Sequence, residues 1–157
     1  MKRMLALCAL ALVVIAGTAI GQEMKSSHVV VKPAELKWGP PPPVFDKSAS
    51  FTVISGDPSK AGMFVVRLQM PAGYKIAPHW HPTDEHVTVL SGTFSIGMGE
   101  KFDTASMQAL PEGGYVLLPA EMRHYAMAKT KATVQVHGMG PFQLTYVNPA
   151  DDPSKKM

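Results

Sequence analysis

Three of the six histidines in the chain fall within eight residues of one another, beside two acidic residues. His79 and His81 are two positions apart, and Glu85 follows after the short segment 82–84. Residues two apart on a β-strand point to the same face, so these two imidazoles can hold one ion. A turn over residues 82–84 can bring the Glu85 carboxylate back to that ion. Imidazole with carboxylate suits Mn, Fe, Co, Ni, Cu or Zn, whereas Ca and Mg prefer oxygen ligands.

The surrounding sequence resembles the two signature motifs of the cupin superfamily. Residues 73–92 match the first motif, G(X)5HXH(X)3-4E(X)6G, at every fixed position. Residues 113–128 match the second motif, G(X)5PXG(X)2H(X)3N, at its first glycine, its proline and its histidine, which are Gly113, Pro119 and His124. Glu121 replaces the second glycine and Ala128 replaces the asparagine. A glutamate at a turn glycine needs a negative φ or local strain, so the shape of this turn is open.

The resemblance implies that His79, His81, Glu85 and His124 together bind one divalent transition metal. Fe or Mn is favoured, with Zn, Ni, Cu and Co as alternatives. Three imidazoles and one carboxylate leave one or two coordination positions open, as in catalytic sites, and Glu85 is also a candidate base. Cupins with this ligand set include dioxygenases, oxalate-metabolising enzymes, isomerases and sugar-related enzymes, while others only bind metal or ligand.

Three functions therefore stay open for the chain. A metal-dependent enzyme acting on a small molecule, of dioxygenase type, is favoured. The alternatives are a non-catalytic cupin of the cell envelope that binds or senses a metal or ligand, and a protein in which metal only stabilises the fold. Fold and ligands do not decide between them. Nucleic acid is excluded as a partner because the chain has no dense Lys/Arg patch and no nucleic-acid motif.

Four polar side chains on two expected strands are candidates for the pocket. Arg67 and Gln69 share one face of the strand expected at 63–70, and Gln135 and His137 share one face of the strand after the second motif. If these faces are interior, Arg67 can clamp a substrate carboxylate. The alternative is that each strand has a solvent-facing side.

Two aromatic residues next to the ligands have separate interpretations. Tyr125 follows His124 and is a candidate for the mouth of the pocket, although strand aromatics usually pack. His86 follows Glu85, so on a strand it points to the opposite face, and it is not assigned as a ligand.

The residues from 49 onward have the pattern typical of an all-β domain. The strands of this domain must position the side chains named above. Short runs rich in Val, Thr, Phe and Ile alternate with Gly, Pro, Asp and Ser. Strands are expected near 51–55, 63–70, 75–80, 86–91, 93–98, 107–110, 114–119, 124–128, 132–138 and 142–147. We expect a cupin domain over residues 49–147, with a double-stranded β-helix (jelly-roll) barrel of the RmlC-like type.

The first residues have the pattern of a secretory signal peptide. Lys2 and Arg3 precede an apolar run over residues 4–15, and Ala19 and Gly21 form a small-x-small cleavage site. We expect residues 1–21 to be removed and the mature chain to be exported to the periplasm or the medium, with no membrane attachment. Its net charge then falls from +3 to +1, because 13 basic residues face 12 acidic ones.

Two terminal segments flank the expected domain. Residues 22–48 form a Pro-rich arm with four consecutive prolines at 40–43, either a flexible tether or a segment strapped to the barrel by Trp38 and Phe45. Within this arm, residues 29–31 are a candidate edge strand, and because many small cupins pair edge strands, the resemblance makes them a candidate homodimer contact. The polar tail 148–157 is expected to fray.

Overall fold

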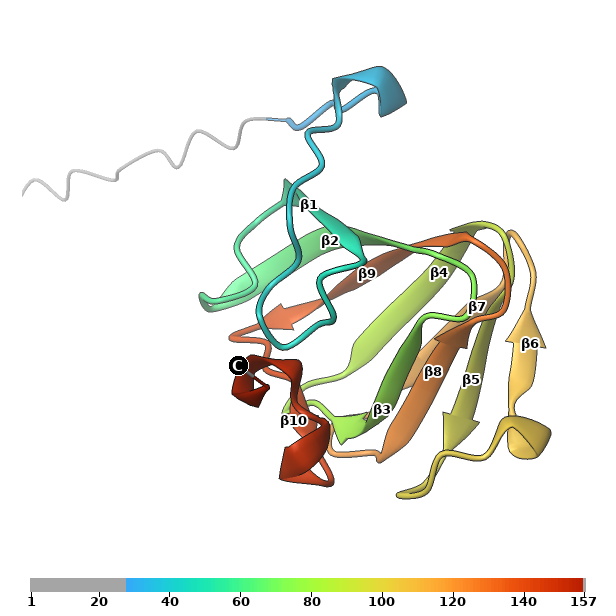
Figure 1. Cartoon of the computed structure of the whole chain (residues 1–157). Coiled ribbons are helices and arrows are strands. Elements are labelled where there is room, and N and C mark those ends of the chain that lie inside the picture. The colour runs from blue at the N-terminus through green and yellow to red at the C-terminus, as the bar shows by residue number, and fades with distance from the viewer. Residues whose placement is uncertain (1–27, 157) are drawn as a thin grey trace, which may run out of the picture.

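The computed structural model describes residues 28–156, which form a nearly all-β fold (Figure 1). The signal-peptide interpretation of residues 1–21 lies outside the described residues. Within the described chain, each of the ten expected strands is present, with ends that differ from expectation by a few residues. No helix in the described part is long and apolar enough to cross a membrane.

The strands form two antiparallel five-stranded sheets that face each other. The first sheet has the order β1 (Ser50–Ser55), β2 (Gly62–Met70), β9 (Ala132–Gly140), β4 (Glu85–Ser91) and β7 (Tyr115–Leu118). The second has the order β10 (Thr145–Tyr146), β3 (Lys75–Trp80), β8 (His124–Ala128), β5 (Phe94–Met98) and β6 (Gln108–Leu110). This is the expected jelly-roll arrangement. The described strands pair into two separate sheets, so the jelly roll is not a closed barrel.

The core lies between the sheets and follows the alternation of apolar residues along each strand. In β2, alternate residues from Phe64 to Met70 are buried and apolar, while the residues between them are partly exposed. In β4, Val87 and Val89 face the same interior, and in β9 Val134 does so. Alternation with a period of two places one set of side chains in the core and the other set outside.

The N-terminal arm, here residues 28–48, is strapped to the domain from Gly39 onward. Gly39 forms an antiparallel bridge with Phe51, with both N–H···O distances at 2.9 Å. The hydroxyls of Tyr146 and Tyr74 donate to arm carbonyls, at 2.8 Å to Val44 and 3.2 Å to Asp46. Figure 1 shows the arm passing β1 and reaching the C-terminal segment.

Both ends of the described chain differ from expectation. Residues 29–31 are exposed and form no strand in the described chain, so the edge-strand expectation is wrong, and the homodimer stays a prediction. The tail is not frayed up to residue 156. It forms two short 3-10 helices, η3 (Pro149–Asp151) and η4 (Pro153–Lys155), whose first turns are capped by the side chains of Asn148 and Asp152.

Candidate metal centre

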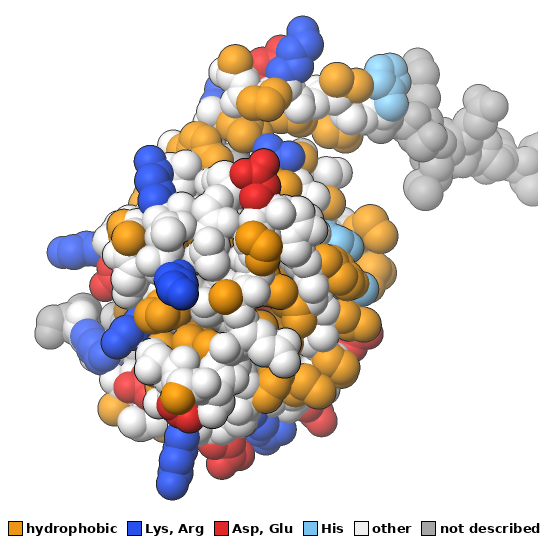
Figure 2. Space-filling model, turned by 90° about the vertical axis from the view of Figure 1, so that its right-hand side faces the viewer, with side chains coloured by type: hydrophobic (Ala, Val, Ile, Leu, Met, Phe, Trp, Pro, Cys, Tyr) orange, Lys and Arg blue, Asp and Glu red, His pale blue; other side chains and the backbone are white. Residues whose placement is uncertain are grey.

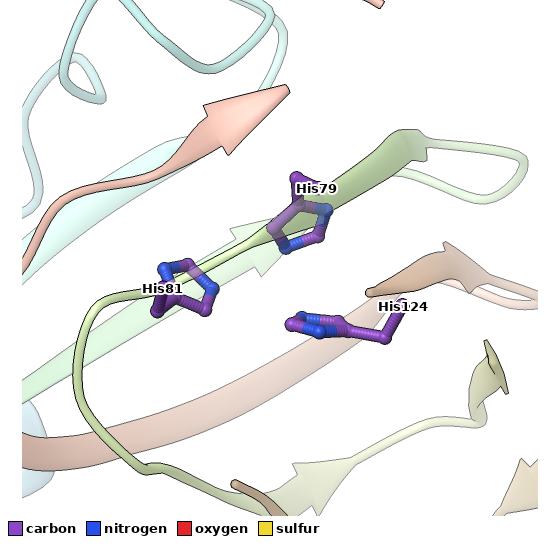
Figure 3. A group of neighbouring side chains, drawn as sticks. All are labelled: His79, His81 and His124. Atoms are coloured by element: carbon purple, nitrogen blue, oxygen red, sulfur yellow. The ribbon is translucent and has the colours of Figure 1, made fainter. Parts of the chain in front are cut away.

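Three buried imidazoles meet at one end of the space between the sheets (Figure 3). His79 lies in β3, His81 follows the end of β3, and His124 begins the neighbouring β8. His79 and His124 are cross-strand partners, which sets their rings side by side with centroids 4.2 Å apart. One potential ligand atom from each of the three residues lies within 4.8 Å of the others. This spacing allows all three nitrogens to bind one ion.

A backbone carbonyl fixes the tautomer of each ring. The Nδ1 atoms of His79, His81 and His124 lie 2.7, 2.8 and 2.9 Å from the carbonyl oxygens of Ala77, Gln143 and Met122. A carbonyl oxygen can only accept, so each Nδ1 carries the proton and donates it. Each Nε2 is therefore left with a free lone pair. This is the arrangement by which metal-binding histidines are commonly oriented.

Two of these lone pairs are buried without a hydrogen-bond donor. The Nε2 atoms of His81 and His124 have no hydrogen-bond partner among the described residues. An unsatisfied buried polar atom costs about 1–3 kcal/mol, so it marks either strain or a missing partner. A metal ion fits these atoms as that partner, because neutral imidazole nitrogen is a common ligand of transition metals.

Glu85 approaches the histidines from the opposite sheet. It begins β4, and its Oε2 lies 3.4 Å from Nε2 of His81 and 3.3 Å from Nε2 of His124. Burial alone would raise the pKa of this carboxyl, but the adjacent His81 and His124 hold it well below its usual range. Burial, together with the neighbouring imidazoles, lowers the pKa of His79 to about 3. The site thus favours an ionised carboxylate and a neutral imidazole, the forms that bind a cation.

The turn before His124 keeps the left-handed shape of the second motif despite its glutamate. Glu121 has a φ of 63° and is the one non-glycine residue with positive φ in the described chain. Its N–H donates to the His81 carbonyl at 2.7 Å, which ties the turn to the end of β3. A left-handed backbone costs a residue with a Cβ roughly 1–2 kcal/mol. Of the two possibilities for this turn, a negative φ or local strain, the structure has local strain.

The three histidines and the glutamate of the candidate metal centre stand on the wall of a cavity of about 150 Å³ between the sheets. Every other residue that lines it in the described chain is apolar. Pro42, Val44 and Phe45 of the arm form part of the wall, and Phe142 stacks on the His81 ring at 4.2 Å with an interplanar angle of 18°. The cavity is therefore a largely apolar chamber with one polar wall that could hold a cation.

Residues 26–143 match the family described as the ChrR cupin-like domain. This chain is a cupin of that family. No curated protein matches it with significance.

Solved cupin structures share the fold of this cupin at low sequence identity. A putative acetylacetone dioxygenase from Methylibium petroleiphilum PM1 is 21% identical, with a TM-score of 0.62 over 82% of this chain and 87% of that one. The polyketide cyclase RemF from Streptomyces resistomycificus is 14% identical, with a TM-score of 0.66 over 83% and 94%. An RmlC-like cupin from Shewanella frigidimarina is 13% identical, with a TM-score of 0.56 over 73% and 91%. At these identities the similarity establishes the fold.

The four polar pocket candidates of this cupin lie outside the cavity, which corrects the sequence-based expectation. Arg67 and Gln135 are cross-strand partners on the outer face of the first sheet, where Arg67 Nε donates to Gln135 Oε1 at 3.1 Å. Gln69 Nε2 donates to Thr133 Oγ1 at 3.4 Å, and His137 stacks on His86 with centroids 4.7 Å apart. The apolar residues between them already fill the inner face of β2 and β9, so the polar set must face outward.

Tyr125 also lies outside the cavity, although it is buried. It follows the ligand His124 on β8, so it points to the opposite face. Its ring packs at 5.0 Å from Phe102, and its hydroxyl donates to the Asp103 carbonyl at 3.0 Å. The sequence did not predict that the arm and Phe142 line the cavity. The alternative in which Phe45 straps the arm to the domain was the one indication of it.

Proposed function

We propose that this cupin is an exported, metal-dependent enzyme that carries out a dioxygenase-type reaction on a small, largely apolar molecule. The observation that carries the proposal is the pairing of two features in one chamber. Three histidines with free Nε2 lone pairs and one ionised glutamate share a wall, and the rest of the chamber is apolar.

The three histidines and Glu85 are residue types that hold a metal ion and leave it open to substrate. A divalent transition metal held by them would supply a Lewis acid with open coordination positions and, if it is Fe or Mn, a redox centre. The carbonyls of Ala77, Gln143 and Met122 hold the three rings in the binding tautomer. Glu85 lines the chamber with an ionised carboxylate, the form required of the base. The apolar walls exclude water from proton transfer to that base.

The size and lining of the chamber define the class of substrate. An engineered apolar protein cavity of about 150 Å³ binds benzene, so a volume of about 150 Å³ here admits a molecule of similar size. Because its polar wall consists of His and Glu, the substrate would turn oxygen atoms to that wall and an apolar body to the rest. A small diketone or enol has this shape. The structural similarity to a protein described as a putative acetylacetone dioxygenase agrees with this class.

The first test joins metal analysis with oxygen consumption. Purified wild-type protein should hold close to one equivalent of Fe or Mn and consume O₂ with a small β-diketone, while His81→Ala should lose both properties. Val136→Phe places a larger side chain in the chamber wall and changes none of the four metal residues. It should keep the metal and lose turnover. Retained turnover in Val136→Phe would contradict the assignment of the chamber as the substrate site.

A non-catalytic binding or sensing role is the second candidate. In the described part of the chamber, no polar side chain lines the wall apart from the four metal residues. The chamber therefore has no separate acid–base pair, which favours this role. In that case the metal-loaded protein should bind a small diketone, seen by calorimetry, without O₂ consumption or product. Val136→Phe should then abolish binding while metal content stays the same.

Export is part of the proposal and rests on the sequence pattern of residues 1–21. The full chain should be processed on expression in a Gram-negative host. The mature protein should be recovered from the periplasm with Gln22 as its first residue, as determined by mass spectrometry. A full-length chain in the cytoplasmic fraction would contradict export without affecting the metal site.

A further inference from the structure

Two histidines and two methionines gather on the outer face of the first sheet, away from the chamber. His86 in β4 and His137 in β9 are direct cross-strand partners. Met63 in β2 and Met139 in β9 are also direct partners, and His137 and Met139 are two residues apart on the same face. Partner side chains in antiparallel strands have Cβ atoms about 4.5–5.5 Å apart. These four residues, here called the outer His/Met cluster, therefore form one continuous set.

The outer His/Met cluster lines a surface depression together with Asp84. The depression is lined by Met63, Thr83, Asp84, His86, Ala120, His137, Gly138 and Met139. The Met63 and Met139 side chains are 68% and 52% exposed, which is unusual because methionine usually fills cores. Figure 2 shows histidine side chains at the surface beside hydrophobic ones. Two thioethers and two imidazoles thus share one accessible hollow.

The two imidazoles are held together and leave nitrogens free. Their rings stack with centroids 4.7 Å apart and an interplanar angle of 12°. Nδ1 of His86 lies 2.7 Å from the Tyr115 hydroxyl, so the Nε2 of His86 is left for another partner. Burial and the neighbouring His86 lower the pKa of His137, which favours the neutral ring that binds metals. The Asp84 carboxylate accepts the Ala120 N–H at 2.8 Å and adds negative charge to the hollow.

We propose that His86, His137, Met63 and Met139 form a second metal site on the outer face of the first sheet, selective for monovalent copper. Thioether sulfur is a soft ligand that selects Cu(I), whereas Mg, Ca and Mn prefer oxygen. Imidazole also suits copper, and both rings line the same hollow as the two thioethers. The site is separate from the inner centre, because His86 and Glu85 are adjacent on one strand and point to opposite faces.

The test observes the methionine methyl groups directly. Protein labelled with ¹³C in the methionine methyl groups is first loaded with Zn to fill the inner site. It is then titrated with Cu(I) without oxygen, against a Cu(I) chelator that sets the free concentration. The methyl resonances of Met63 and Met139 should shift together and saturate at one further equivalent. The resonance of Met107, which follows the short helix η2 (Thr104–Ser106) and lines neither the chamber nor the hollow, should not move.

Variants separate the outer site from non-specific copper binding. The double variant Met63→Leu with Met139→Leu keeps apolar volume but removes both sulfurs, and His137→Gln removes one imidazole. Each should weaken Cu(I) binding roughly tenfold or more, the range seen when groups supporting a metal site are removed. Met107→Leu is the matched control and should leave binding unchanged. Unchanged binding in the double variant, or Cu(I) that displaces Zn without moving the two methyl resonances, would overturn the proposal.

Discussion

Nε2 of His124 lies 3.3 Å from Oε2 of Glu85, although His124 belongs to β8 in the second sheet and Glu85 to β4 in the first. The candidate metal centre therefore joins the two sheets. An ion bound at this point would link strands that share no backbone ladder, so occupancy should be visible in the stability of the whole domain.

Metal loading should raise the melting temperature of this cupin. At a free metal concentration of 1,000 times the dissociation constant, binding adds about 4 kcal/mol, which corresponds to roughly 8–16 °C for a domain of this size. Differential scanning calorimetry of metal-free and reloaded protein measures this shift. His81→Ala should melt at the same temperature with and without metal. A full shift in His81→Ala would mean that the stabilising ion binds elsewhere.

Glu85→Gln should weaken divalent metal binding while keeping the fold. The substitution keeps the shape of the side chain but removes the negative charge that lies beside His81 and His124. We expect the Zn dissociation constant to rise roughly 10- to 100-fold in competition with a chelator. Glu112→Gln removes a surface carboxylate and is the matched control. Equal Zn affinity in wild type and Glu85→Gln would remove Glu85 from the ligand set.

Glu121→Gly should stabilise the domain. Glu121 has a φ of 63°, and glycine adopts this conformation without the Cβ penalty. The penalty of roughly 1–2 kcal/mol is partly offset by the freedom that glycine adds to the unfolded chain, so we expect a gain of about 1 kcal/mol in urea unfolding. Glu112→Gly, at a position without positive φ, should lower stability instead.

Gly97→Ala should destabilise the second sheet. A Cβ at Gly97 would overlap with ring atoms of the buried Tyr125. Overpacking of this kind typically costs about 1–3 kcal/mol. Gly39→Ala is the matched control, because a Cβ there meets nothing within 4 Å, and it should stay within about 0.5 kcal/mol of wild type. Urea unfolding compares the two variants, and equal stabilities would contradict the packing described for Tyr125.

The arm should loosen at alkaline pH. Burial, with the nearby charge of Asp46, raises the pKa of Tyr74 to about 12. The folded pKa exceeds the unfolded value of about 10, so the stabilisation is complete below pH 10 and is lost as pH rises through 12. Melting temperatures measured over this range should fall less in Tyr74→Phe than in wild type. Tyr115→Phe changes an exposed tyrosine and should follow the wild-type curve.

The sequence predicted the strands well because their apolar residues alternate with clear turn signals between them. The spacing of His79 and His81 predicted their common face, and the structure brings both to His124. For the pocket candidates the sequence predicts only that Arg67 and Gln69 share one face of their strand. Which face is interior depends on the side that packs against the second sheet, and the structure places Arg67 and its partner Gln135 on the outer face.

The arm could not be predicted in the same way, because its position depends on contacts between distant residues. The bond from the Tyr146 hydroxyl to the Val44 carbonyl joins residues 102 apart, and no local pattern encodes such a pairing. The outer His/Met cluster is likewise a product of strand register, since Met63 and Met139 become neighbours only when β2 pairs with β9.

That long-range bond from Tyr146 to Val44 also bears on how the chain folds. The arm contributes Val44 and Phe45 to the chamber wall, yet it is anchored by a residue of the last strand. On a ribosome the arm emerges before its anchor, because Val44 precedes Tyr146 by 102 residues. Folds dominated by such non-local contacts form slowly, in milliseconds to seconds. The chamber of this cupin can therefore be completed only after β10 has been synthesised, so its arm wall is among the later parts of the domain to mature.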